Sequence, residues 1–226
     1  MELPLILVNF KCYVAGKKAF ELAKKCEKIA RKYKIRIAVA PQFVDIKEIA
    51  NLKIQTFAQH MDAIEEGAFT GHISAKALKE AGAKGVIINH SERKLSLKEI
   101  ESCVKIAKKF KLITVCCAES LEEGKRIAKL EPDFLAYEDP FLIGSGRAIS
   151  RVKPESVKKF VEDIGKLEPK VKVLCGAGIS SGLDVKKALE LGTVGVLVSS
   201  SVVKAKDPKK ILEEFAKAIE IETKFI

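Results

Sequence analysis

The chain has 226 residues, of which 47% are hydrophobic and 31% charged, a balance typical of soluble globular proteins. No apolar stretch approaches the ~18 residues of a membrane span, so a membrane partner is not expected. Without a linker rich in Pro, Gly or Ser, we predict a single domain over residues 1–226. The N-terminus lacks a basic region and a small-residue cleavage site, which predicts a cytoplasmic protein.

The formal net charge of +11 leaves nucleic acid, an anionic membrane or a small anionic substrate as partners. Basic residues are interleaved with Glu, as in residues 24–28 and 153–170, and form no platform with aromatic residues. The spread of charge therefore indicates a solvated surface and argues against nucleic acid.

Cysteine and histidine spacing predicts no metal site. The six cysteines include no Cys-x-x-Cys, and the three histidines are far apart. We expect buried free thiols in a reducing compartment.

Short apolar runs rich in β-branched residues recur along the chain, as expected for strands covered on both faces of a parallel sheet. They predict strands at 5–8, 35–40, 54–58, 86–88, 112–117, 134–137, 171–175 and 194–198.

The segments between these runs carry helix start signals. Capping boxes are predicted at Ser96, Ser120 and Ser181, and Pro154 and Pro208 suit first-turn positions. Eight strand-helix units predict an α/β fold, a (β/α)₈ TIM barrel of eight parallel strands with outer helices. An open doubly wound sheet remains an alternative, although no Gly-x-Gly-x-x-Gly follows the first strand.

Polar clusters follow several of these strands, where a barrel of this kind builds its active site. They are Asn9 and Lys11 after the first strand, His90 after the fourth, Glu138 after the sixth, 175–178 after the seventh and 199–201 after the eighth. Their convergence at one mouth predicts a site for proton transfer.

Each of three side chains has a chemical role in this interpretation. Lys11 would stabilise negative charge on a reacting oxygen, with Asn9 holding its ammonium. His90 would be a neutral hydrogen-bond donor, because backbone N–H groups of the following connection favour a neutral ring. Glu138 would be the general base, since its apolar neighbours should raise its pKa.

The connection after Glu138, through Gly144 and Gly146, is predicted to be a lid that excludes water. Backbone N–H groups of Gly144, Gly178, Ser199 and Ser200 would cradle a phosphate, because small residues let the main chain approach an anion.

With these residues in place, the chain resembles the triosephosphate isomerase family in its short archaeal form. The shared motifs are Asn9-Phe10-Lys11, Gly67-Ala68-Phe69-Thr70-Gly71, Asn89-His90-Ser91-Glu92-Arg93, Glu138 with its lid, and Cys175-Gly176-Ala177-Gly178-Ile179. The pairing of a Glu base with a neutral His is an established example from this family rather than an inference from these residues.

The resemblance implies interconversion of dihydroxyacetone phosphate and D-glyceraldehyde 3-phosphate through an enediolate, in glycolysis and gluconeogenesis, with no cofactor. It implies catalytic Glu138, His90, Lys11 and Asn9, and substrate contacts from Asn9, Phe10, Lys11, Ile143, Gly144, Gly178, Ser199 and Ser200. Glu92 would pair with Lys11. Thr70 would support the site of a neighbouring subunit, so at least a homodimer is implied, with a homotetramer as an open alternative.

Two positions depart from the family pattern. Asp139 stands where the family usually has Pro, and Ser201 stands in a loop that is usually smaller and contains Gly. We expect Asp139→Pro to speed or tighten lid closure, and Ser201 to narrow the phosphate pocket or add a donor.

Two other functions remain open at this point. One is a barrel enzyme acting on a different sugar phosphate, although no middle or late strand carries a Lys placed for a Schiff base at the mouth. The other is a barrel that only binds anions, whose affinity would fall steeply with added salt.

Overall fold

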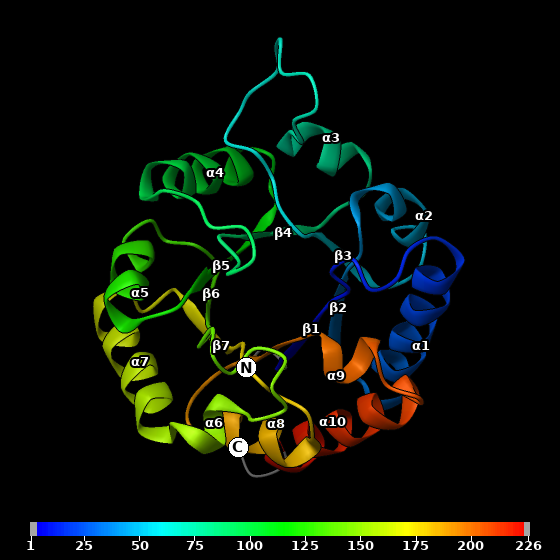
Figure 1. Ribbon diagram of the computed structural model, residues 1–226, viewed down its shortest axis with the longest axis vertical. Helices are drawn as coiled ribbons and strands as arrows, with labels where there is room; N and C mark the ends of the chain where they lie inside the picture. Colours follow the sequence, from blue (N-terminus) through cyan, green and yellow to red (C-terminus); the bar gives the residue numbers. More distant parts are fainter. Residues whose placement is uncertain (1–3, 224–226) are drawn as a thin grey trace.

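The computed structural model describes residues 4–223 and places eight parallel strands in a closed barrel surrounded by helices (Figure 1). The strands pair in chain order, and β8 pairs with β1 to close the ring. They are β1 (Leu5–Asn9), β2 (Arg36–Ala40), β3 (Gln55–Ala58), β4 (Gly85–Ile88), β5 (Ile113–Ala118), β6 (Phe134–Tyr137), β7 (Lys172–Cys175) and β8 (Gly195–Val198). Each predicted strand end lies within one residue of the observed end, and the barrel prediction is confirmed.

Helices follow the strands and form the outer ring. They are α1 (Lys17–Tyr33), the 3₁₀ helix η1 (Phe43–Asp45), α2 (Ile46–Ile49), α3 (Ala75–Glu80), α4 (Leu97–Lys109), α5 (Leu121–Ala128), α6 (Ile149–Val152), α7 (Pro154–Leu167), α8 (Gly182–Glu190), α9 (Ser200–Val203) and α10 (Pro208–Thr223). The predicted boxes at Ser96 and Ser181 are complete, and α7 and α10 begin at the predicted prolines.

The third predicted capping box, at Ser120, is only half formed. Its side chain accepts a hydrogen bond from the Glu123 backbone N–H, as expected. The Glu123 carboxylate does not return to Ser120 and instead accepts from the Glu119 N–H at 2.8 Å and from the Asn89 amide at 2.9 Å. Competing partners at the mouth of the barrel therefore draw this carboxylate away from its own helix.

Alternating strand residues form two apolar layers. One cluster takes residues from every strand, including Leu7, Ile87 and Leu174, and fills the barrel interior. Their neighbours in sequence, such as Ile6 and Val8, pack outward against the helices. Each fully buried aliphatic side chain contributes about 1.5–3 kcal/mol, so these layers fix the strand ends on which the polar residues stand.

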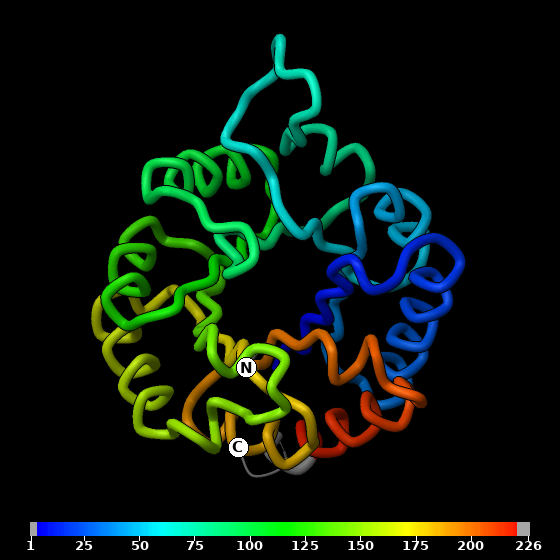
Figure 2. The backbone as a smooth tube through the Cα atoms, viewed as in Figure 1, coloured from blue at the N-terminus to red at the C-terminus, as the bar shows by residue number. Residues whose placement is uncertain are grey.

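Two long connections differ in where they lie. Residues 59–74, between β3 and α3, project away from the barrel (Figure 2). Residues 138–148, between β6 and α6, lie at the mouth, where the carbonyl of Arg147 closely approaches Gly178 in the next connection.

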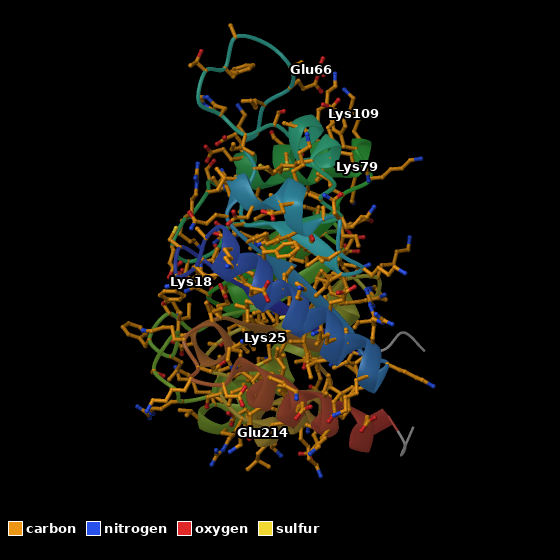
Figure 3. The ribbon with its side chains drawn as sticks, turned by 90° about the vertical axis from the view of Figure 1, so that its right-hand side faces the viewer. Lys18, Lys25, Glu66, Lys79, Lys109 and Glu214 are labelled. Carbon is orange, nitrogen blue, oxygen red and sulfur yellow. The ribbon has the colours of Figure 1, made fainter. Side chains whose placement is uncertain are left out.

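The surface carries the dispersed charge that the sequence predicts. The labelled cations in Figure 3, Lys18, Lys25, Lys79 and Lys109, come from three different helices. Within residues 4–223, no helix is both long and apolar enough to cross a membrane, and no cluster of acidic, His and Cys side chains is arranged to hold a metal ion. The predicted domain also includes residues 1–3 and 224–226, which lie outside the described part.

The cysteines differ from expectation at one position. All six are free thiols and five are buried, but Cys12 is exposed. It lies in the connection between β1 and α1, outside the strands and helices.

Candidate active site

A small cavity opens at the carboxyl ends of the strands, with a volume of about 230 Å³. It brings together side chains and main chain from the connections after β1, β4, β6, β7 and β8. Its lining consists of Asn9, Lys11, His90, Glu138, Ile143, Gly144, Gly146, Gly176, Gly178, Ile179, Ser180, Leu197, Val198, Ser199, Ser200, Ser201 and Lys204. The convergence predicted from the strand ends is therefore observed.

Glu138 follows directly after β6 and is 1% exposed. Its backbone N–H donates to the Ala118 carbonyl at 2.9 Å, which continues the pairing of β6 with β5. Its Oε1 lies 3.5 Å from His90 Nε2, and Oε2 is buried with no hydrogen-bond partner in the described part of the chain. Burial raises the pKa of Glu138 to about 7, against smaller lowering effects from the Cys117 thiol and the Lys11 ammonium.

The Glu138 side chain has its position because Gly176 has no side chain. A Cβ on Gly176 would lie 2.6 Å from Glu138 Cγ, closer than real Cβ contacts come. The Gly176 N–H also donates to the Tyr137 carbonyl at 2.9 Å, so the backbone cannot simply withdraw. The sequence showed Gly176 only as part of a glycine-rich turn, and its role of making room for the carboxylate was missed.

His90 follows β4 and is almost completely buried. Its Nδ1 accepts a hydrogen bond from the Glu92 backbone N–H at 3.1 Å. An accepting nitrogen carries no proton, so the neutral ring holds its proton on Nε2, the nitrogen nearer Glu138. Burial, reinforced by the Lys11 cation, lowers the pKa of His90 to about 4.

Asn89 fixes the turn that carries His90. It adopts a left-handed conformation with φ of 61°, which Asn tolerates better than most residues. Its Nδ2 donates to the Cys117 carbonyl and to Glu123, each at 2.9 Å, and its Oδ1 accepts from the Leu95 N–H at 2.9 Å. The turn is thus held from three sides.

Lys11 lies across the mouth and is paired as expected. Its Nζ is 2.6 Å from Glu92 Oε1. Asn9 was expected to hold the ammonium, but its Oδ1 instead accepts from the Lys11 backbone N–H at 2.9 Å. Lys11 has φ of 48°, so the Asn9 contact stabilises an unfavourable backbone conformation rather than the charged group itself.

Gln59 is a supporting residue that the sequence interpretation missed. Its Nε2 donates to the Lys11 and Ala40 carbonyls, each at 2.9 Å, so both polar groups of the Lys11 backbone are held by side chains. Gln59 is the first residue after β3, and the rule that polar residues at strand ends build the site could have found it.

The β7 and β8 side of the cavity presents mostly small residues. Gly178 has φ of 72°, and a Cβ there would lie 2.1 Å from the Arg147 carbonyl, so the 138–148 connection can pack here only against glycine. Ser199 and Ser201 each have a buried hydroxyl oxygen without a hydrogen-bond partner in the described residues. Lys204 adds a second cation to the lining.

Comparison with known proteins places nearly the whole chain in one enzyme family. The family model described as triosephosphate isomerase matches residues 4–218. The chain belongs to the triosephosphate isomerase family. Proteins named triosephosphate isomerase from Methanosarcina mazei and Methanothermus fervidus are each 48% identical, covering 97% and 95% of this chain and 100% and 98% of their own. One from Methanocaldococcus jannaschii is 45% identical over 95% of this chain and 100% of its own.

Two residues that the resemblance to the triosephosphate isomerase family implied are not in the cavity. Phe10 is fully buried in the apolar core, and its N–H donates to the Ala40 carbonyl at 2.9 Å, so the substrate contact expected of Phe10 stays a prediction. Thr70 is exposed in the projecting 59–74 connection, and its implied role in the site of a neighbouring subunit stays a prediction.

Proposed function

We propose that the protein interconverts dihydroxyacetone phosphate and D-glyceraldehyde 3-phosphate, as the names of its relatives suggest. The observation that carries the proposal is the buried Glu138 carboxylate, with a pKa of about 7, facing a neutral His90. A base with this pKa can both accept and return a proton near neutral pH. The role in glycolysis and gluconeogenesis, and the cytoplasm as its compartment, form part of the proposal.

In the proposed reaction, Glu138 removes a proton from the carbon next to the carbonyl and returns it to the neighbouring carbon. The Nε2–H of His90 donates to the substrate oxygen as negative charge develops, and the Lys11 ammonium stabilises that charge. A neutral donor suits this step because it can also exchange a proton between the two oxygens of the enediolate. No cofactor takes part.

The phosphate group is proposed to bind on the β7 and β8 side. Main-chain N–H groups of Gly178, Ser199 and Ser200 would hold it, and Ile143 and Gly144 would add contacts as the lid closes. The cavity of about 230 Å³ is smaller than the roughly 300–1,000 Å³ of pockets for drug-sized ligands, which favours a three-carbon substrate over larger sugar phosphates.

The proposed assembly is a homo-oligomer, at least a dimer, with a tetramer as the alternative. Three observations support it: the 59–74 connection projects from the barrel, it exposes Phe69, and a second hollow beside Lys11 is lined by Cys12, Val44 and Gln59. Thr70 would reach this hollow in a neighbouring subunit. Sedimentation of the wild type beside a variant with residues 67–71 shortened tests this, since a wild-type monomer would exclude it.

The decisive test is conversion of D-glyceraldehyde 3-phosphate to dihydroxyacetone phosphate by wild type and Glu138→Gln. The amide keeps the shape of the carboxylate but removes the base, so kcat should fall by about 10³-fold or more. Glu162→Gln, an exposed position on α7, is the matched control and should keep wild-type activity. A folded wild type without turnover would redirect the search to another sugar phosphate or to a binding protein.

A further inference from the structure

An ion pair joins the two ends of the lid segment. Asp139 comes directly after Glu138, and Lys153 comes directly after α6. Their side chains meet at 2.5 Å between Oδ2 and Nζ. The pair therefore closes a loop that contains every residue between the base and α7.

Asp139 is held by more than this one contact. Its Oδ1 accepts from the Phe141 N–H at 3.0 Å, and its carbonyl accepts from the Leu142 N–H at 2.9 Å. The residue is only 6% exposed. A carboxylate so deeply placed is costly without its cation, so Asp139 depends on the ammonium of Lys153, whose own side chain is half exposed.

Lys153 is anchored at the start of a well-packed helix. Its carbonyl accepts from the Ser156 N–H at 3.1 Å and the Val157 N–H at 3.2 Å, in the first turn of α7. From the same helix, Phe160 stacks on Tyr137 with ring centroids 4.4 Å apart. One helix thus contacts the residue before Glu138 through Phe160 and the residue after it through Lys153.

We propose that Asp139 and Lys153 are positioning residues that clamp the main chain of Glu138 to α7 while the rest of the lid moves. The proposal rests on the function proposed above. A base attached to the fixed end of a moving loop would otherwise shift with it, and a displacement of about 1 Å can cost roughly 10²-fold in rate. The clamp acts through Glu138 and does not itself touch the substrate.

The clamp changes the expectation for Asp139→Pro. A proline at this position removes the carboxylate and both of its hydrogen bonds. Slower turnover, rather than faster or tighter closure, is therefore expected of that variant.

The test compares Lys153→Met, Asp139→Asn and the double variant with the wild type. We expect each single variant to lower kcat about 10-fold with KM within about twofold, because binding groups are untouched and only the base is misplaced. The double variant should be no slower than either single one, since the pair acts as a unit. Lys153→Arg should restore most of the activity.

Lys159→Met is the matched control, because it removes the same type of charge from α7 and breaks an exposed contact with Asp163 at 3.3 Å. Its kcat should equal that of the wild type. Losses in the double variant equal to the product of the single losses would overturn the clamp. So would kcat values within twofold of wild type in both single variants, even if their melting temperatures fell.

Hydrogen exchange followed by mass spectrometry tests the clamp independently of turnover. Amides of residues 139–148 should exchange several-fold faster in Lys153→Met than in Lys159→Met. Unchanged exchange would overturn the proposal. A wild type without turnover but with this exchange difference would refute the proposed function and leave the clamp supported.

Discussion

The two sides of the mouth are built differently. On the β1 and β4 side, Lys11, His90 and their neighbours are fixed by a dense set of hydrogen bonds from Asn9, Gln59 and Asn89. On the β6 to β8 side, Glu138 Oε2 and the hydroxyls of Ser199 and Ser201 have no partner in the described chain. On the β1 and β4 side the polar groups are hydrogen-bonded to one another. On the β6 to β8 side several buried polar atoms have no partner among the described residues.

This difference follows from what each side is proposed to do. Charge that develops during reaction is stabilised best by donors that need no rearrangement, and such donors have to be held in place beforehand. A base and a lid have to change their partners during the cycle, so permanent partners there would oppose the reaction. In this proposal, permanent hydrogen bonds lie on the β1 and β4 side because the groups there keep their positions during the reaction.

Of the substitutions that test this comparison, His90→Gln on the β1 and β4 side should have the largest effect. Glutamine cannot place a neutral donor at the position of Nε2 and also accept from the Glu92 N–H, so both contacts cannot be kept. We expect kcat to fall by about 10³-fold, within the range for loss of an acid–base group. Steady-state kinetics with a folding check by circular dichroism gives the answer, and a loss below fivefold would mean that this ring is only structural.

On the β6 to β8 side, Gly176→Ala tests whether the position of the Glu138 carboxylate depends on the absence of a side chain at residue 176. The added methyl group would meet Glu138 Cγ, so we expect kcat to fall by about 10²-fold as the carboxylate is displaced. Gly165→Ala in α7 is the matched control, because a Cβ there meets nothing within 4 Å. It should keep activity and stabilise the helix by up to about 1 kcal/mol. Equal kinetics in the two variants would exclude the steric argument.

A smaller effect is expected from Gln59→Met, which removes hydrogen bonds from the β1 and β4 side without changing a charged group. The Lys11 carbonyl loses its donor while Lys11 keeps a strained backbone, so the ammonium should become less well placed. We expect KM to rise about 10-fold with a smaller change in kcat.

Gln42→Met is the control for this variant, because its amide also donates to a carbonyl of the same connection, that of Val14 at 3.3 Å. If both variants raise KM equally, the effect belongs to the whole connection rather than to Lys11.

The sequence predicted the barrel and most of the mouth because both follow from local patterns. A buried parallel strand is a continuous apolar run, and the first polar residue after it marks the end that faces the mouth. This rule located Lys11, His90 and Glu138, although their catalytic roles stay predictions. The burial of Phe10 was not predicted, because a motif shared with a family does not say which of its residues faces the core.

Other features could not be predicted because they depend on contacts between distant segments. Gly176 leaves space for the side chain of Glu138, and Lys153 pairs with Asp139 across the connection that follows β6. The Asn9 side chain was assigned to the wrong part of Lys11, since sequence order cannot tell a backbone N–H from an ammonium. Such details require the register between strands and connections.

The last prediction concerns the pH dependence of turnover in the unaltered protein. The proposed reaction needs ionised Glu138, whose pKa is raised to about 7 by burial. kcat/KM should therefore be constant at pH values above the pKa of Glu138 and fall tenfold for each pH unit below that pKa. His90, with its pKa lowered to about 4, should not titrate in this range. A profile flat from pH 5 to 8 would contradict the assignment of the base.

Cys117 gives this profile an internal control. Its thiol hydrogen bond to Glu138 lowers the pKa of the carboxyl group, in opposition to burial. Cys117→Ala should therefore move the acid limb to higher pH, whereas Cys117→Ser, which keeps a donor, should leave it close to the wild type. Cys103→Ala creates a similar void at another buried thiol, one that donates to the Met61 carbonyl, and should not move the limb. A shift in all three variants would point to loosened packing, and a shift in Cys117→Ala alone would show that one weak hydrogen bond helps to set the pKa of the base.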